Sequence, residues 1–357
     1  EELSVIPREC FINCYSLTFD KLPQGLSKVE KLAFANCRGL LILSLHSGIE
    51  EIERNAFLNC ENVIGLLVEN AEVLKGRDLS QLFGRKGLKG VEYVILKNYT
   101  SIPDGCFEDY VKLSFLVIEG DVKRIGKNAF KGCSGLTSLD ISGKCEYIGE
   151  GAFYGCSSLQ SLSFGNLSVS KIEKDTFNGC KSLRFSIPAT VSEIGERAFY
   201  GCKALSSLSI PASVKAIGRQ AFGAIGDIVS LSMHYINERT KLKDFLDEES
   251  VKSLEVAEFL DAPQIPAYFF DGCENLISLV LSYDPESVGE YAFRNCGNLP
   301  NFDFIKSVKK LGKGAFYNCK TLKALNFSSE LEEIPDEAFK NCLEISKLFI
   351  PETVKKI

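Results

Sequence analysis

Residues 205–222 read LSSLSIPASVKAIGRQAF, and this stretch decides the fold because its pattern returns along the whole chain. It ends at a Phe, a small Ala directly precedes that Phe, and an Ile stands five residues before it. An aliphatic residue precedes every further copy of this Phe at the same distance. The copies are Phe11, Phe34, Phe57, Phe107, Phe130, Phe153, Phe177, Phe199, Phe222, Phe270, Phe293, Phe316 and Phe339.

Successive copies of this Phe are 22, 23 or 24 residues apart except at two places, where the intervals are 50 and 48 residues. Each long interval is about two periods, so each contains one degenerate unit, at about 70–98 and 224–262. Self-similarity at a fixed short period is the signature of a solenoid. We therefore predict a single repeat domain over residues 1–357, built from about 15 coils of roughly 23 residues.

Each unit carries apolar residues at plus six, nine and eleven from its Phe, as in Leu136, Leu139 and Ile141 after Phe130. The last two alternate with polar residues, which predicts a short strand with one buried face. Stacked units bury these rows together, so we expect one parallel sheet on the concave face of a curved stack. The position after the Ile is Gly in six units and Pro in four. Since Pro fixes φ near about −65°, we expect Gly there to permit close backbone approach.

The unit resembles the BspA-like, or treponemal-class, leucine-rich repeat, and the resemblance covers practically the whole chain. It implies a leucine-rich-repeat solenoid of α/β type, mostly β with short helical turns. It also implies a bacterial or protist cell-surface family with members regarded as adhesins for host proteins. The motif is nearly intact at Leu205, Leu208, Ile210, Pro211, Val214, Ile217, Gly218, Ala221 and Phe222.

Fourteen Cys are present, and eleven of them stand three residues after the repeated Phe. We predict a ladder of small buried thiols, because Cys packs as a small hydrophobe. Disulfides between adjacent coils remain an alternative. Zinc sites need a close Cys pair together with a second pair or His. The one close pair, Cys10 and Cys14, has no such partner within its coil, so we expect no metal and no other cofactor. The ladder is Cys14, Cys37, Cys60, Cys133, Cys156, Cys180, Cys202, Cys273, Cys296, Cys319 and Cys342.

Composition excludes several classes of function. A formal charge of −6 with mixed signs gives no electrostatic footprint for nucleic acid. The sequence has no run of about 18 apolar residues, so it predicts no membrane-spanning helix. The two His lie in distant coils and no Ser–His–Asp set is evident, so we expect no enzyme. The chain opens inside a unit at Glu1, without a signal peptide or capping unit, so we expect a segment of a longer protein.

Outward-facing residues of the strand row fall at plus eight, ten and twelve, and in the middle coils they are small and polar. Nearer the N-terminus they turn apolar, and exposed apolar surface marks interaction sites. The alternative is that the irregular coil at 70–90 covers them, or that they only pack on one another. A second, smaller candidate is Val280, Ile305 and Phe349. In the degenerate coil, Tyr93 and Ile95 face outward if Val94 and Leu96 face inward; a one-residue slip would reverse this, but an apolar residue would still face outward. The main ligand-binding candidates are Ile42, Leu67, Tyr93, Ile95, Phe115 and Val117.

We therefore expect a non-enzymatic protein-binding module, secreted or at the cell surface, with the localisation implied by the family resemblance. The resemblance further suggests an adhesin for host extracellular-matrix or plasma proteins. Two alternatives remain: a rigid spacer that presents another domain, and a carbohydrate-binding module. The spacer predicts no tight partner, whereas a carbohydrate binder needs exposed aromatic residues beside carboxylates.

Overall fold

A computed structural model describes residues 3–19, 21–74, 79–84, 90–300 and 302–357. The chain divides into two compact units, unit 1 (Glu1–Thr190) and unit 2 (Val191–Ile357), so the single domain stays a prediction. In both units every pair of neighbouring strands for which a register is given is parallel. The chain makes about 14 turns, close to the 15 coils expected from the sequence. The leucine-rich-repeat solenoid is thereby confirmed.

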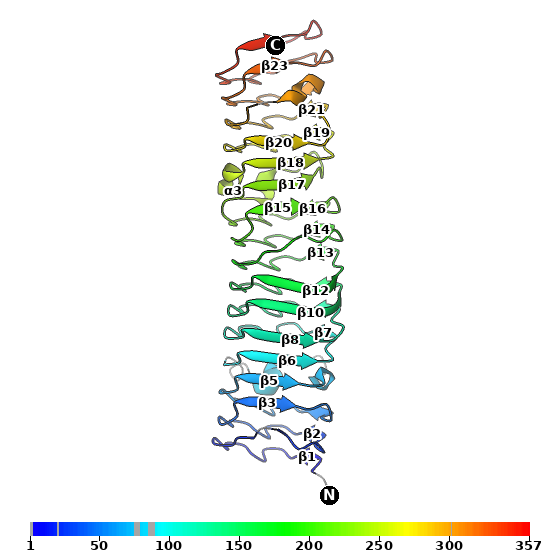
Figure 1. Ribbon diagram of the computed structural model, residues 1–357, viewed down its shortest axis with the longest axis vertical. Helices are drawn as coiled ribbons and strands as arrows, with labels where there is room; N and C mark the ends of the chain where they lie inside the picture. Colours follow the sequence, from blue (N-terminus) through cyan, green and yellow to red (C-terminus); the bar gives the residue numbers. More distant parts are fainter. Residues whose placement is uncertain (1–2, 20, 75–78, 85–89, 301) are drawn as a thin grey trace. The chain divides into compact units, whose positions relative to one another are not determined.

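Unit 1 carries its longer strands on one side, which we call the strand face (Figure 1). Two sets of two-residue strands, β1-β2-β4 and β7-β9-β11, form separate short sheets. The strand face, in the order β3-β5-β6-β8-β10-β12, consists of β3 (Ile42–Leu45), β5 (Gly65–Val68), β6 (Tyr93–Lys97), β8 (Phe115–Glu119), β10 (Ser138–Cys145) and β12 (Ser161–Leu167). The short strands of unit 1 are β1 (Val5–Ile6), β2 (Lys28–Val29), β4 (Glu51–Ile52), β7 (Ser101–Ile102), β9 (Arg124–Ile125), β11 (Tyr147–Ile148) and β13 (Lys171–Ile172).

Unit 2 has the same design, but its strand face is split into a four-stranded sheet, β15-β17-β18-β20, and a two-stranded sheet, β23-β24. These strands are β15 (Ser207–Ile210), β17 (Ser230–His234), β18 (Val256–Leu260), β20 (Ser278–Leu281), β23 (Ala324–Asn326) and β24 (Lys347–Phe349). Its short strands are β14 (Glu193–Ile194), β16 (Ala216–Ile217), β19 (Gln264–Ile265), β21 (Ser287–Val288) and β22 (Lys310–Leu311).

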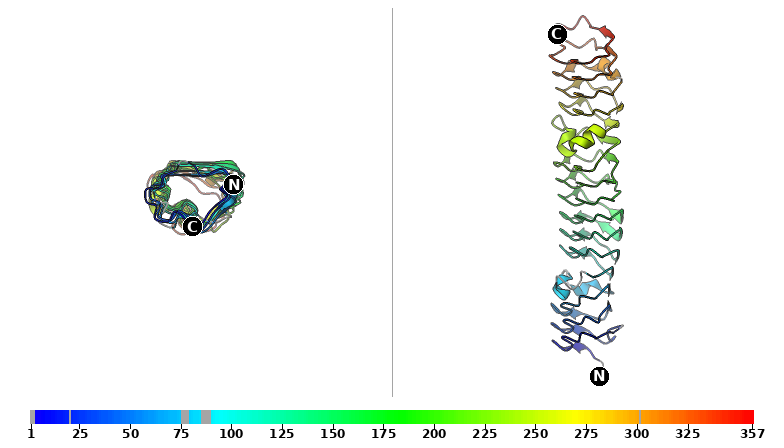
Figure 2. Two further views of the ribbon diagram at one scale, coloured as in Figure 1. Left: turned by 90° about the horizontal axis from the view of Figure 1, so that it is seen from below. Right: turned by 90° about the vertical axis from the view of Figure 1, so that its left-hand side faces the viewer.

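The few helices lie in irregular coils. The coil at 70–98 contains η1 (Ala71–Leu74) and α1 (Ser80–Phe83), and the coil at 224–262 contains α2 (Leu242–Phe245) and α3 (Glu248–Ser253). A fifth helix, η2 (Asp303–Ser307), lies between β20 and β23. Figures 1 and 2 show α3 beside the strand face of unit 2, at the end where β17 and β18 begin.

The repeated Phe residues stack on one another along the inside of each unit. The ring centroids of Phe34 and Phe57 are 5.2 Å apart with an interplanar angle of 3°. Phe83 of α1 continues this row, 5.4 Å from Phe57, and so supplies the rung that the sequence pattern lacks. Phe245 of α2 does the same beside Phe222, at 6.4 Å and edge-on. Each degenerate stretch therefore holds one further coil, as predicted.

Close approach between coils explains the Gly after the repeated Ile. Gly126 has no left-handed φ, and a Cβ placed on it would lie 2.6 Å from the carbonyl carbon of Pro103 in the preceding coil. Left-handed backbone occurs instead two residues before and two residues after the Phe. The later position is Asn, Asp or Gly in nearly every unit, as at Asn36 (φ 61°) and Gly132 (φ 76°), residue types that tolerate positive φ.

Candidate functional site

The six predicted binding residues lie on neighbouring strands of unit 1 in register. Tyr93 of β6 pairs with Phe115 of β8, and the same strands pair Ile95 with Val117. On the other side of β6, Leu67 of β5 pairs with Ile95. One column runs from Ile42 of β3 past Gly65 to Tyr93 and Phe115, and the adjacent column of Leu67, Ile95 and Val117 crosses β5, β6 and β8. The structure brings all six together, and we call Ile42, Leu67, Tyr93, Ile95, Phe115 and Val117 the apolar strand patch.

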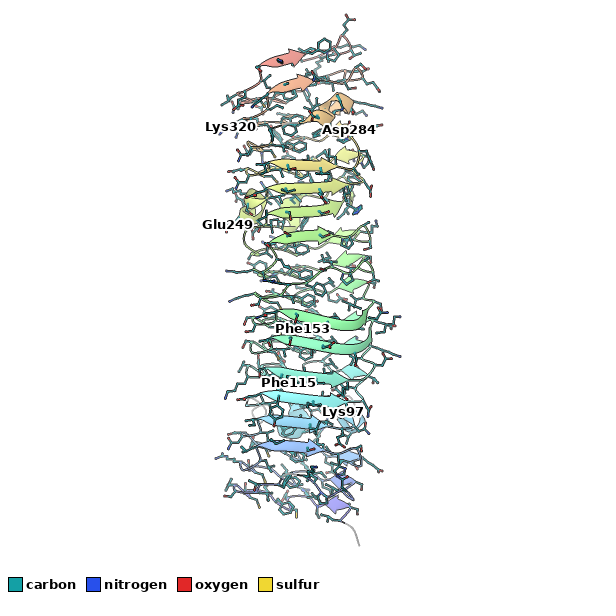
Figure 3. The ribbon with its side chains drawn as sticks, viewed as in Figure 1. Lys97, Phe115, Phe153, Glu249, Asp284 and Lys320 are labelled. Carbon is teal, nitrogen blue, oxygen red and sulfur yellow. The ribbon has the colours of Figure 1, made fainter. Side chains whose placement is uncertain are left out.

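Exposure is unequal within the apolar strand patch. Ile42 is 48% exposed and Phe115 is 54% exposed, while the other four residues are half-buried. Figure 3 labels Phe115 near the start of β8 and Lys97 near the end of β6. Burial alternates along these strands, as it does in β6, where Val94 and Leu96 are fully buried. The inward side chains of these strands pack in the core, while the patch residues lie on the opposite side of the sheet.

Tyr93 owes its partial burial to Gly65. The two residues pair directly between β6 and β5, and a Cβ on Gly65 would overlap the Tyr93 ring. The ring therefore lies over the space that a side chain at position 65 would fill. Gly65 belongs to the site, and sequence reasoning missed it, because only the register between strands 28 residues apart reveals the contact.

Two further exposed apolar residues adjoin the patch. Leu41 is 54% exposed and Ile64 is 37% exposed. They stand seven residues after their Phe, just before the strand, and the Ile64 amide donates to the Leu41 carbonyl at 2.8 Å. Sequence reasoning considered only plus eight, ten and twelve. The signal that could have found them is the apolar residue at plus seven, where later units of this half carry Ser114, Thr137 and Gln160.

Polar contacts border the patch on two sides. Toward β12, the Ser163 hydroxyl donates to Asp140 at 2.7 Å. At the carboxyl ends of β6 and β8, Lys97 and Glu119 form an exposed ion pair at 3.9 Å. Polar side chains therefore border the patch toward β12 and at the carboxyl ends of β6 and β8.

The described parts of the irregular coil at 70–90 do not cover the patch. In α1 the carbonyls of Leu82 and Phe83 accept hydrogen bonds from the amides of Phe57 and Asn59. That contact lies at the Phe turn, whereas η1 packs against β4. Both elements are therefore away from the strand face. Residues 75–78 and 85–89 of the predicted covering segment lie outside the described residues.

The second candidate set is only partly exposed. Val280 of β20 is 47% exposed and Phe349 of β24 is 66% exposed. Ile305 is 4% exposed, so the expectation that it faces outward is wrong. It lies in η2 instead of a strand, and the helical turn rotates its side chain into the core.

The predicted thiol ladder has one recurring contact. The Sγ of Cys133 lies 3.0 Å from the carbonyl oxygen of Phe107 in the preceding coil, and Cys319 repeats this with Phe293 at 3.1 Å. Burial raises the pKa of the Cys60 thiol to about 12 and that of Cys37 to about 11. All these Cys are free thiols in the structure, and most are buried. Such protonated, buried thiols are poor nucleophiles.

The ladder is not buried throughout. Cys14 is exposed and Cys342 is intermediate, so the expectation of burial is wrong at these two positions. The physical reason is that each lies in the first or last coil of the described chain, with fewer neighbouring coils around it. Cys10, outside the ladder, is exposed as well.

Both His residues of the chain, His46 and His234, lie within the described ranges. There the two His have separate surroundings: His46 bonds the Pro23 carbonyl through Nε2 at 2.9 Å, and His234 bonds Asp261 through Nδ1 at 2.7 Å. Within the same ranges, no group of three or more His, Cys, Asp or Glu could hold a metal ion. Among the described helices, none has the length and apolarity to cross a membrane.

The comparisons with known proteins concern the repeat. A family model described as BspA type Leucine rich repeat region matches residues 1–73, 100–229, 170–262 and 243–357. Among curated proteins, none matches this chain. A solved leucine-rich repeat protein from Bacteroides ovatus is 20% identical, and the match covers 99% of this chain and 82% of that chain with a TM-score of 0.47.

Two other solved structures are similar over most of their length. A leucine rich cell surface protein from Faecalibacterium prausnitzii is 19% identical, with 98% of this chain and 87% of that chain covered and a TM-score of 0.33. An internalin from Listeria monocytogenes is 13% identical, with 79% and 87% covered and a TM-score of 0.31.

Proposed function

Because the chain belongs to the BspA-type leucine-rich repeat family, we propose that it is a non-enzymatic protein-binding module, secreted or displayed at a cell surface. Its partner in this proposal is a host extracellular-matrix or plasma protein, which makes the chain an adhesin. The observation that carries the proposal is the apolar strand patch. Its side chains are held in register on a sheet whose other outward positions are mostly polar.

The composition of the patch suits a protein partner. Aromatic and aliphatic side chains dominate the centres of protein interfaces, where truncation of a single anchor costs on the order of 2 kcal/mol. Phe115 and Ile42 are the most exposed residues of the patch, and Tyr93 adds a hydroxyl to an apolar ring. Exposed apolar surface costs solubility, so its concentration at one place in unit 1 favours an interaction role.

A long repeat face also supplies affinity without a deep pocket. The patch crosses four strands spaced about 4.8 Å apart, so one partner can contact several coils at once. Many weak contacts over such a face add to a useful affinity when the partner is held in one orientation. The chemistry required of the residues is complementarity of shape and polarity, and no reacting group is needed.

Surface plasmon resonance of the 357-residue chain against fibronectin, fibrinogen, laminin and collagen tests the proposal. We expect saturable binding to at least one of them. The affinity of the Ile42→Asp/Phe115→Asp variant for that protein should be at least about tenfold lower. Both side chains are exposed, so circular dichroism should show an unchanged fold. Val229→Asp is the matched control, because Val229 is 46% exposed but lies in unit 2.

Each outcome separates the alternatives. Binding that survives the double variant would keep the adhesin and remove the patch as its site. Binding to isolated glycans but to none of the deglycosylated proteins would favour a carbohydrate-binding module. No binding to any of these ligands would favour the spacer that presents another domain.

A further inference from the structure

Gly65 is an exception in its column of the strand face. Figure 1 shows the strands of this column, β3, β5, β6 and β8, side by side. Gly65 has no left-handed φ, so its backbone conformation does not require Gly. Gly weakens the interior of a strand and often marks the close approach of another group. The column consists of Ile42, Gly65, Tyr93 and Phe115.

The group that approaches Gly65 is the ring of Tyr93. The three atoms nearest to a Cβ built on Gly65 are Cζ, Cε2 and the hydroxyl oxygen of Tyr93. The far end of the ring therefore reaches over β5, toward β3. Although Tyr93 and Phe115 pair in register and are both described, the structure has no ring contact between them. This agrees with a Tyr93 ring that leans away from β8.

The hydroxyl of Tyr93 is the one polar side-chain group of the apolar strand patch, whose other members are Ile, Leu, Val and Phe. Its position over β5 is flanked by Ile42 on β3 and by Leu67, two residues after Gly65. Within the ranges that the structure describes, the hydroxyl has no hydrogen-bond partner. Since Tyr93 is already half-buried, a partner that covers the patch buries this hydroxyl.

This burial restricts the chemistry of the partner. A hydroxyl buried without a hydrogen bond costs more than a satisfied one contributes. Strands β5 and β6 are paired on both sides, so their backbone groups serve the sheet and the partner has to supply the missing group. A charged group would lose its water against aliphatic side chains. A neutral carbonyl or amide group therefore fits best.

We propose that Tyr93 is the specificity-determining residue of the apolar strand patch and that Gly65 is its positioning residue. The partner that fits has an apolar surface with one neutral carbonyl or amide group over β5, which bonds the Tyr93 hydroxyl. Gly65 leaves the room in which the ring lies, so the hydroxyl is held at one place. This inference rests on the proposed function, because it takes the patch as the binding site.

Two kinds of probe test this inference by surface plasmon resonance. The first is each protein among fibronectin, fibrinogen, laminin and collagen that binds the chain. The second is a set of peptides selected from a random phage library against the full chain. These peptides are counter-selected against the Ile42→Asp/Phe115→Asp variant, so that only binders of the patch remain. They test Tyr93 even where no matrix or plasma protein binds.

Tyr93→Phe removes the hydroxyl and keeps the ring. It should lower the affinity for patch-dependent probes about tenfold, because the partner's buried carbonyl or amide group loses its hydrogen bond. Tyr283→Phe is the matched control, since Tyr283 is 49% exposed and lies in unit 2. This control should leave the affinity within about twofold.

Gly65→Ala should lower the affinity as well, because its methyl group displaces the ring from its place over β5. In the Tyr93→Ala background the same change should leave the affinity unaltered, since no ring is left to displace. Nitration by tetranitromethane, followed by mass spectrometry of proteolytic peptides, needs no partner. Tyr93 should be nitrated faster in Gly65→Ala than in the unchanged chain, with Tyr283 as the internal reference. Circular dichroism checks the fold of each variant.

Three results would overturn the inference. The first is patch-dependent binding that Tyr93→Phe leaves unchanged or makes tighter, which would keep the patch as the site but make the partner apolar over β5. The second is a Tyr93 nitration rate that Gly65→Ala does not alter. The third is the absence of any patch-dependent binder, which would remove the proposed site too. If selected peptides need the Tyr93 hydroxyl but no matrix or plasma protein binds, the adhesin fails and this inference stands.

Discussion

The Sγ of Cys156 lies 3.0 Å from the carbonyl oxygen of Phe130, one coil earlier, and donates a hydrogen bond to it. The same Phe130 carbonyl also accepts the amide of Cys133 within its own coil. The repeated Cys therefore ties each coil to the one before it, at the place where the Phe ring stacks on its neighbour. A side chain at this position must be small, apolar and able to donate one hydrogen bond, and Cys meets all three conditions.

The thiols should differ widely in reactivity. Burial raises the pKa of Cys60 to about 12, so at pH 8 its thiolate fraction is about a thousandfold below that of an ordinary thiol. Cys10 and Cys14 are exposed. We expect iodoacetamide at pH 8 to alkylate these two first, as measured by mass spectrometry of proteolytic peptides.

The denatured chain is the control, and all 14 Cys should react in it. Labelling of Cys133 or Cys156 in the native chain at the rate of Cys14 would contradict the buried ladder. A mass deficit of two hydrogens per Cys pair before reduction would instead show disulfides between coils.

The backbone conformation at position 224 should be unfavourable for Ala. It lies two residues after Phe222 with φ of 52°, where other units carry Asn, Asp or Gly. An L side chain in this conformation costs about 1–2 kcal/mol, and part of that is offset by the greater flexibility of Gly in the unfolded chain. We expect Ala224→Gly to raise the free energy of unfolding by up to about 1 kcal/mol in urea titrations followed by circular dichroism.

Ala221→Gly serves as the comparison, because Ala221 is fully buried and lacks a left-handed φ. This variant should lower the free energy of unfolding. If both Gly variants destabilise the protein equally, backbone strain at position 224 is not the cause.

Much of this architecture could be predicted from the sequence. The 23-residue period predicts the Phe rungs and the outward positions of Ile42, Leu67, Phe115 and Val117, whereas Tyr93 and Ile95 in the degenerate coil follow from local alternation, whose register only the structure fixes. The period failed at residues 302–305, where the alternation of Phe302 and Phe304 predicts a strand. Phe304 lies in η2 and Phe302 directly precedes that helix, close to Pro300, which has no amide hydrogen to donate to a neighbouring strand. The contact between Tyr93 and Gly65 could not be predicted from the sequence either, because it depends on the register between β5 and β6 and not on the sequence pattern of either strand.

Asp271 should make the stability of unit 2 depend on pH. Asp271 is 4% exposed, and its carboxylate accepts hydrogen bonds from Arg294 at 2.8 and 2.7 Å and from Lys243 at 3.0 Å. Burial alone would raise the pKa of Asp271, but the hydrogen bonds from Arg294 and Lys243 outweigh it and lower the pKa. This stabilisation is therefore complete above the unfolded pKa of about 3.9 and is lost as the pH falls through the lower folded value.

Asp271→Asn should lower the free energy of unfolding by about 2 kcal/mol at pH 7, less than for a fully buried pair because Arg294 and Lys243 reach solvent. The difference from the unchanged chain should shrink as the pH falls below about 4, because the carboxylate is protonated first in the unfolded state and, at lower pH, in the folded state. Urea unfolding at pH 7, 5 and 3 measures it, with exposed Asp227→Asn as the matched control. A difference that stays constant down to pH 3 would mean that Asp271 acts through packing and not through its charge.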